Sequence, residues 1–213
     1  MHNEENNNNN NKNNFEEFNI ITLGDPGVGK TSIFKRFLDD GFDHNQLSTL
    51  GVSFSSKVIT INKRNLLLKL TDTGGQEKYR SIAASYFRNV DVVLFVFDLN
   101  NKKSFNSIQY WFDFFDQNNS GRKIKNKYLI GNKNDLEQKI EQESIDELTE
   151  KNNILYMSTS AKDNYQIEQL FNYIGGELCN YLDKNNEKNK GKNNSKGKVL
   201  SKTNVNKKKS KCC

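Results

Sequence analysis

Short apolar runs alternate with amphipathic stretches from about residue 18 to residue 182, and this alternation predicts strands interleaved with helices. Runs rich in Val, Ile, Leu and Phe predict six strands, at 18–23, 52–61, 65–71, 91–98, 127–130 and 154–157. Helical spacing predicts helices over 32–38, after a cap at Ser104, over 141–150 and over 165–182. The pattern indicates an α/β fold with a mostly parallel six-stranded sheet, helices on both faces and the ligand at the carboxyl ends of the strands.

Two of the predicted helices carry apolar stripes that are expected to face the core. The stripes are Phe105, Ile108, Trp111, Phe112 and Phe115, and Ile167, Leu170, Phe171, Ile174 and Leu178. A binding site could explain the first cluster of rings, but core packing is favoured. Cys179 is interpreted as a small core residue rather than a reactive thiol. Gly175 and Gly176 stand inside the last helix, where each glycine costs about 1 kcal/mol.

Composition divides the chain into three segments. Residues 1–14 contain nine asparagines and are expected to be disordered, because they cannot bury enough apolar surface to offset chain entropy. Residues 15–183 form the predicted domain, with a long exposed loop at 39–51. Residues 184–213 contain almost nothing apolar and carry a net charge of +10, so we expect a flexible, solvated tether there. The rest of the chain is mildly acidic, at −4 of a total of +6.

The sequence predicts neither a secretory signal nor a membrane span. The longest apolar run, from Val92 to Phe97, has six residues, whereas a spanning helix needs about 20. Three cysteines cannot form a disulfide framework, which favours a reducing cytosol. The lysine-rich tail also suggests nucleic-acid binding, but it has no aromatic side chains to stack on bases and the domain is acidic. No nucleic-acid partner is therefore expected.

Residues Gly24 to Thr31, Gly-Asp-Pro-Gly-Val-Gly-Lys-Thr, fit the phosphate-loop pattern Gly-x-x-x-x-Gly-Lys-[Ser/Thr]. A predicted strand precedes them and a predicted helix follows, which is the geometry that aims backbone N–H groups and a helix N-terminus at phosphates. Lys30 would then reach the β- and γ-phosphates, and the Thr31 hydroxyl would bind Mg²⁺. The chain is therefore expected to bind a nucleoside triphosphate.

Five motifs in order make the chain resemble the Ras-like small GTPases and, within them, the Rab branch. They are the phosphate loop, Thr49, Asp72-Thr73-Gly74-Gly75-Gln76, Asn132-Lys133-Asn134-Asp135, and Ser160-Ala161-Lys162. The resemblance covers about residues 18–183 and the C-terminus, and it implies the phosphate-loop G-domain fold. It implies these nucleotide-binding residues: Gly24, Asp25, Pro26, Gly27, Val28, Gly29, Lys30, Thr31, Ser32, Phe42, Thr49, Asp72, Gly75, Asn132, Lys133, Asp135, Ser160, Ala161 and Lys162.

The choice of guanine also has a physical reason. A carboxylate at Asp135 can accept hydrogen bonds from the ring N–H and exocyclic amine of guanine, whereas adenine would leave a buried carboxylate unpaired. The resemblance implies that Asn132 braces the site, that the Lys133 stem lies along the base, and that the Ala161 N–H meets the guanine oxygen. In isolation, Asn-Lys-Asn-Asp would more simply be a polar turn; its place after a buried strand, together with the other motifs, favours the base site.

For the chemistry, the resemblance implies that Thr31, Thr49 and Asp72 hold Mg²⁺, and that Gln76 orients the attacking water. The catalytic candidates are Gln76, Lys30 and Thr49, with GTP as substrate and GDP as product. No arginine lies in the 40–51 loop, so we expect slow intrinsic hydrolysis, accelerated by an activating protein.

The chain departs from the family pattern at two positions near this chemistry. Pro26 stands where the family has a small residue, and Gly74 stands where it has alanine. These departures leave open an alternative, a GTP-binding module with little or no hydrolysis.

The Rab resemblance also implies partners. Residues Gln46, Leu47, Ser48, Thr49, Leu50, Gly51, Val52, Ser53 and Phe54 form the expected effector loop, and Thr71 stands where Rabs carry an aromatic residue. The terminal Cys212 and Cys213 match the doubly geranylgeranylated end of Rabs, and two lipid chains with a basic tail anchor a protein stably to anionic membranes.

The resemblance implies a cycle between the cytoplasmic face of membranes and the cytosol. Its expected partners are effectors, an exchange factor, a GTPase-activating protein and a GDP-dissociation inhibitor. The protein itself is expected to be a monomer that directs vesicle traffic.

Overall fold

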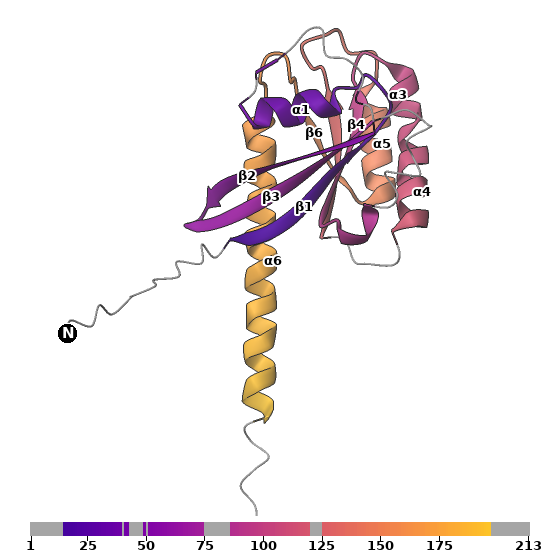
Figure 1. The fold of residues 1–213 in the computed structure, drawn as a ribbon. Coiled ribbons are helices and arrows are strands. Elements are labelled where there is room, and N and C mark those ends of the chain that lie inside the picture. Colours follow the sequence, from indigo (N-terminus) through magenta and orange to yellow (C-terminus); the bar gives the residue numbers. More distant parts are fainter. Residues whose placement is uncertain are drawn as a thin grey trace, which may run out of the picture.

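Six strands form one sheet in the computed structural model, which describes residues 15–39, 41–42, 49, 51–74, 86–119 and 125–196, with side chains as far as 188 (Figure 1). Their spatial order is β2-β3-β1-β4-β5-β6. The strands are β1 (Glu16–Leu23), β2 (Val52–Ile61), β3 (Arg64–Thr73), β4 (Val92–Asp98), β5 (Asn126–Asn132) and β6 (Leu155–Ser158). All neighbours are parallel except β2, which pairs antiparallel with β3. The predicted fold class is confirmed.

Helices cover both faces of this sheet. The helix α1 (Lys30–Phe37) and the helix α6 (Ile167–Lys196) contribute to one apolar cluster. On the other face lie α3 (Lys102–Asn106), α4 (Ile108–Asn118) and α5 (Gln142–Asn152), and a short 3₁₀ turn, η2 (Phe87–Asn89), adds Phe87 to the same cluster. The sheet and the helices on its two faces therefore form three layers. The functional motifs begin at the edge of the sheet where the parallel strands end.

The central strand β4 shows why both faces are filled. Its alternate residues Val92, Leu94 and Val96 belong to the cluster under α1 and α6. The residues between them, Val93, Phe95 and Phe97, belong to the cluster under α4. Every residue of the strand is buried, because successive side chains point to opposite faces and both faces are covered.

The predicted cap at Ser104 is wrong. Asn101 caps α3 instead, since its side-chain oxygen accepts hydrogen bonds from the Lys103 and Ser104 N–H groups at 3.0 and 3.4 Å. The Ser104 hydroxyl accepts from the Asp98 N–H at 3.0 Å and donates to the Asn101 carbonyl at 2.8 Å. Ser104 therefore joins the end of β4 to α3. The predicted single helix is two, which meet at Ser107, and the expected stripe of rings packs in the core.

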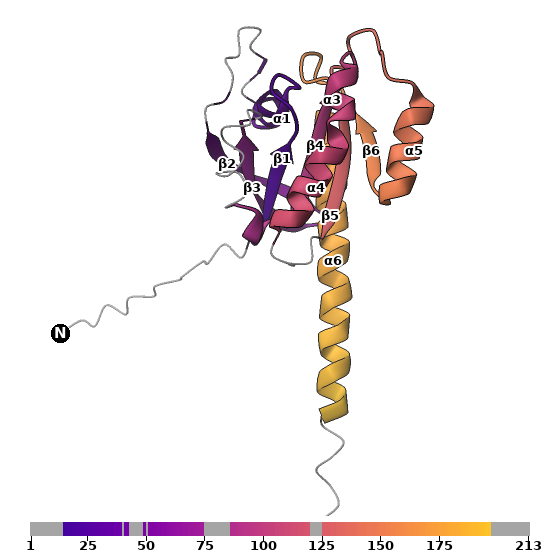
Figure 2. The same ribbon diagram turned by 90° about the vertical axis from the view of Figure 1, so that its right-hand side faces the viewer.

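The last helix is longer than its apolar stripe predicts. α6 continues to Lys196, whereas the stripe predicts an end near Leu182. It projects well beyond the sheet in both views (Figures 1 and 2). The expected flexible tether is therefore helical over residues 184–196, and residues 197–213 lie outside the described part of the chain. No helix in the described ranges is both long and apolar enough to cross a bilayer.

Gly175 gains a physical explanation from the packing of α6 on β2. A Cβ atom built at Gly175 would lie 2.8 Å from side-chain carbons of both Ile59 and Ile61, so a larger residue would force these side chains to shift. A Cβ atom at Gly176 would meet nothing within 4 Å. The buried Cys179 lies in the same cluster, as expected for a core residue.

Candidate guanine-nucleotide site

The phosphate-loop motif forms the turn between β1 and α1. Gly24 has φ 149°, and a Cβ atom there would lie 2.1 Å from the Val96 carbonyl oxygen of the neighbouring strand. Gly29, at the N-terminus of α1, has φ 96°, and a Cβ atom there would lie 2.2 Å from the side-chain amide nitrogen of Asn132. Both glycines are thus required by close approach as well as by backbone conformation.

Lys30 folds back over this loop. Its ammonium group donates to the carbonyl oxygens of Gly24 at 2.9 Å and Asp25 at 2.8 Å, and the side chain is buried. Burial lowers the pKa of Lys30 to about 8, against the opposing attraction of Asp72 and Asp25. The ammonium group is therefore confined inside the loop, within reach of an anion that the loop would hold.

The three predicted metal ligands lie together beside Lys30. The Thr31 hydroxyl donates to one Asp72 carboxylate oxygen at 2.5 Å and accepts from the Thr49 hydroxyl at 2.6 Å, and the Thr49 oxygen lies 3.4 Å from the same carboxylate oxygen. Burial raises the pKa of Asp72, although the Thr31 hydroxyl and Lys30 oppose this shift. Two hydroxyls and one buried carboxylate are hard oxygen donors of the kind that Mg²⁺ prefers, so these residues fit that ion.

On the other side of the loop, Asn132 connects three segments. Its amide nitrogen donates to the Val28 carbonyl at 2.9 Å, and its oxygen accepts from the Thr159 hydroxyl and the Ala161 N–H, each at 3.2 Å. The side chain is buried at the end of β5. Asn132 thus braces the phosphate loop against the Ser160-Ala161-Lys162 segment.

The Asp135 carboxylate is held in place and kept ionised. One oxygen accepts from the Ser160 hydroxyl at 2.6 Å, and the other lies 3.6 Å from the Lys162 ammonium group. Burial would raise the pKa of Asp135, but the Ser160 hydroxyl, its own backbone N–H and Lys162 together hold that pKa below its usual value. An ionised carboxylate is the form that can accept two hydrogen bonds from a base.

A hollow of about 300 Å³ opens between these groups and the loop. Ten residues line it: Gly27, Gly29, Ser32, Phe42, Asn132, Lys133, Asp135, Leu136, Ala161 and Lys162. All except Leu136 belong to the nucleotide-binding set predicted from the sequence, although they come from four separate segments. The hollow therefore lies among the residues that the motifs predict for the base.

Sequence reasoning missed two supports of this hollow. Arg36, on α1, donates to the Ala161 carbonyl at 2.9 Å and to the Lys162 carbonyl at 2.8 Å. The Lys133 ammonium group forms an ion pair of 2.8 Å with Asp98, at the end of β4. Arg36 lies on the helix predicted after the phosphate loop. No local feature of the sequence indicates that its side chain reaches residues 125 positions away.

Several predicted functional residues lie outside the described ranges. These are Gly75, Gln76, the effector-loop residues Gln46, Leu47, Ser48 and Leu50, and the terminal Cys212 and Cys213. The predicted disorder of residues 1–14 lies outside them too. These expectations stay predictions.

The described end of the predicted effector loop runs into β2 and carries an exposed aromatic pair. Phe54 is 61% exposed, and its ring contacts that of Tyr86 edge-on, with centroids 5.1 Å apart. Thr71 stands opposite Phe54 in the register of β2 and β3. The position that carries an aromatic residue in the resembled family thus lies directly beside this pair.

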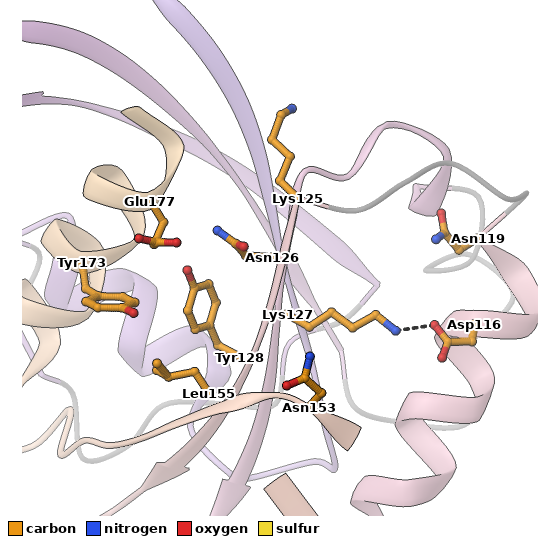
Figure 3. Close-up of a pocket in the computed structure, with 10 residues that line it drawn as sticks. All are labelled: Asp116, Asn119, Lys125, Asn126, Lys127, Tyr128, Asn153, Leu155, Tyr173 and Glu177. Atoms are coloured by element: carbon orange, nitrogen blue, oxygen red, sulfur yellow. Dashed lines mark hydrogen bonds and ion pairs between the residues drawn. The ribbon is translucent and has the colours of Figure 1, made fainter. Parts of the chain in front are cut away.

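A second hollow, of about 550 Å³, lies at the opposite end of β5 and contains none of the predicted nucleotide residues. Figure 3 shows Tyr128 and Asn126 facing Tyr173 and Glu177 of α6, whereas Lys127 lies toward Asp116 of α4. The Lys127–Asp116 ion pair measures 2.5 Å, and burial raises the pKa of Tyr128. This hollow is separate from the nucleotide site, because β5 begins at Asn126 and reaches that site only at Asn132.

Comparison with known proteins agrees with this geometry. The Ras family profile matches residues 19–180. Ras-related protein Rab-13 of Mesocricetus auratus is 32% identical over 163 residues, which cover 76% of this chain and 79% of that protein. GTP-binding protein ypt1 of Schizosaccharomyces pombe is 32% identical over 198 residues, covering 92% of this chain and 96% of that protein. Ras-related protein Rab-8A of Pongo abelii is 32% identical over 182 residues, covering 84% and 87%.

Proposed function

Because the chain belongs to the Ras family of small GTPases and, within it, to the Rab proteins, we propose that it is a guanine-nucleotide switch in vesicle traffic. The observation that carries the proposal is the convergence of two site halves at one edge of the sheet. A hollow bounded by Asp135 and Asn132 fits a base, and the cluster of Thr31, Thr49 and Asp72 lies across the phosphate loop from it. A Mg²⁺-bound guanine nucleotide would occupy both halves.

For hydrolysis, the chain contributes positioning and electrostatics, which are what phosphoryl transfer to water requires. Lys30 would leave the carbonyls of Gly24 and Asp25 for the β- and γ-phosphates. Bound Mg²⁺, held by Thr31, Thr49 and Asp72, would neutralise charge that develops on the phosphates. Gln76 would orient the attacking water, and the Gly75 N–H would bind the γ-phosphate.

The switch would follow from the loss of the γ-phosphate. Thr49 and Gly75 would then lose a partner, so that the segments around them change their order, and an effector that reads Gln46 to Phe54 would be released. No arginine occupies the 40–51 loop, so we propose slow intrinsic hydrolysis that an activating protein accelerates. An exchange factor would restore GTP.

The C-terminal segment would bring this switch to membranes. Geranylgeranyl chains on Cys212 and Cys213, together with the eleven lysines of residues 184–213, would bind the anionic cytosolic leaflet. A GDP-dissociation inhibitor would return the protein to the cytosol. The helical part of α6 beyond Leu182 would separate the domain from the lipid surface by about 1.5 Å per residue while it stays helical.

Single-turnover GTP hydrolysis by the purified protein tests the proposal, alongside Gln76→Leu and Pro26→Gly. We expect a slow wild-type rate that Gln76→Leu abolishes, because only the substituted protein lacks the group that orients water. A wild-type rate as low as that of Gln76→Leu, restored by Pro26→Gly, would instead identify a GTP-binding module whose hydrolysis is blocked at Pro26.

A further inference from the structure

A tryptophan on a distant helix contacts the phosphate loop directly. Trp111, on α4, is 1% exposed, and its indole Nε1–H donates to Oδ1 of Asp25 at 2.8 Å. The two residues are 86 positions apart in the sequence. A buried indole needs a partner for its N–H, and here that partner is the second residue of the phosphate loop.

Asp25 connects this tryptophan to Lys30. Its side chain accepts from the indole, while its backbone carbonyl accepts from the Lys30 ammonium group at 2.8 Å. Gly24, just before it, is fixed by close contact with Val96, and Val28 is fixed through its bond to Asn132. Between them, Pro26 and Gly27 are exposed, and a Cβ atom at Gly27 would meet nothing within 4 Å. The indole therefore holds the loop at the point where its exposed apex begins.

We propose that Trp111 is a positioning residue which, through Asp25, holds the phosphate loop in its binding conformation and so slows nucleotide release. The inference rests on the proposed function, since it requires that the loop bind the phosphates of a guanine nucleotide. Without the indole bond, Asp25 would be free to rotate, and the peptide groups that face the phosphates would lose their fixed direction.

The contact also gives the protein an internal optical reporter. Trp111 is the only tryptophan in the chain, and its N–H touches the nucleotide-binding loop. A change in the loop when nucleotide leaves should alter the hydrogen bond and therefore the indole emission.

A double-mutant cycle with Trp111→Phe and Asp25→Ala tests the proposal, with release of a fluorescently labelled GDP as the readout. Trp111→Phe keeps an aromatic ring but loses the donor and part of the buried ring system, and each single variant should release GDP about tenfold faster, as expected for one hydrogen bond to a charged acceptor. The double variant should be no faster than either single one, because both remove the same bond. Asp25→Asn, which keeps an acceptor oxygen, should lie between wild type and Asp25→Ala.

Phe112→Leu is the matched control, because Phe112 is buried beside Trp111 in the same cluster and makes no bond to the loop in the described structure. It should lower the unfolding midpoint of the GDP-loaded protein without accelerating release. In addition, EDTA-induced release should change the emission of Trp111 in wild type, and that change should be lost in Asp25→Ala.

Release from Trp111→Phe within about twofold of wild type would overturn the proposal. So would multiplying effects in the double variant, equal acceleration by Phe112→Leu, or an emission change that persists in Asp25→Ala. If the purified wild-type protein holds no guanine nucleotide at all, the proposed function itself fails, and this inference with it.

Discussion

The two halves of the proposed nucleotide site are organised differently. Around the base hollow, Asn132, Asp135 and Lys133 bond to groups that frame the hollow and leave it open. On the phosphate side, the functional groups bond to one another: Lys30 to the loop carbonyls, and the threonine hydroxyls to Asp72. The base half is a preformed frame, whereas the phosphate half must exchange its partners when a nucleotide and a metal bind.

This difference separates recognition from switching. A rigid frame discriminates between bases, because a wrong base leaves a fixed polar group unpaired. The phosphate-side groups can bond to one another as well as to a ligand, and such an exchange of partners is what a two-state element requires. Substitutions in the base half should therefore change affinity and specificity, whereas substitutions in the phosphate half should change the response to the metal.

The largest effect is expected from Asp135→Asn. An amide offers one acceptor and places an N–H against the guanine donors, so GDP affinity should fall on the order of 10³-fold. Equilibrium titration with labelled GDP checks this. Asp163→Asn, the same change at an exposed carboxylate in the next loop, should have no effect. An Asp135→Asn affinity close to that of wild type would show that the base does not bind in this hollow.

The dependence of GDP release on Mg²⁺ should distinguish the phosphate half from the base half. Thr31→Ala removes one of the two hydroxyls that meet on Asp72, and GDP release in Mg²⁺ should become about 10–100-fold faster. Stripping the metal from wild type with EDTA should give a similar rate, and EDTA should add little to Thr31→Ala. Thr60→Ala, on the exposed side of β2, is the control. A Thr31→Ala variant that still responds fully to EDTA would place the metal elsewhere.

Arg36→Ala tests whether the Arg36 side chain stabilises the Ala161–Lys162 side of the base hollow. The loss of two hydrogen bonds to the Ala161 and Lys162 carbonyls should speed GDP release about tenfold, since each bond contributes roughly 0.5–1.5 kcal/mol. Arg36→Lys should recover only part of this, because an ammonium group lacks the planar fork. Arg64→Ala, whose partner Asp183 lies on α6, should leave release unchanged. Equal release from Arg36→Ala and wild type would contradict the support role.

The smallest effect is expected outside both halves, from Gly175→Ala. Its Cβ would crowd Ile59 and Ile61, and after the gain in helix propensity the net destabilisation should be about 1 kcal/mol. Gly176→Ala meets nothing and should stabilise by up to about 1 kcal/mol. Denaturant unfolding of the GDP-loaded proteins measures both. Opposite signs at adjacent residues would confirm the packing argument, and equal signs would refute it.

Local patterns were sufficient for most of the fold. The Val-Val-Leu-Phe-Val-Phe run predicted a strand covered on both faces, and β4 is buried throughout. The end of α6 could not be predicted in this way, because residues 184–196 carry no apolar stripe and their helix continues from a segment anchored by the core. The cap of α3 was predicted wrongly because Asn101 and Ser104 are both good capping residues. The Ser104 hydroxyl accepts from the Asp98 N–H, and Asn101 caps the helix instead.

The sequence by itself predicted the chemistry proposed for this protein: the phosphate loop with Thr31 follows from residue types at fixed local spacing, and the family resemblance implies Thr49, Asp72 and the carboxylate at Asp135. Only the tertiary structure decided which distant groups hold them. Trp111 reaches Asp25, Arg36 reaches Ala161, and Asp98 reaches Lys133, across separations of 35 to 125 residues. The reason is that spacing along the chain governs local conformation, whereas these bonds depend on which strand ends and helices the sheet order brings side by side.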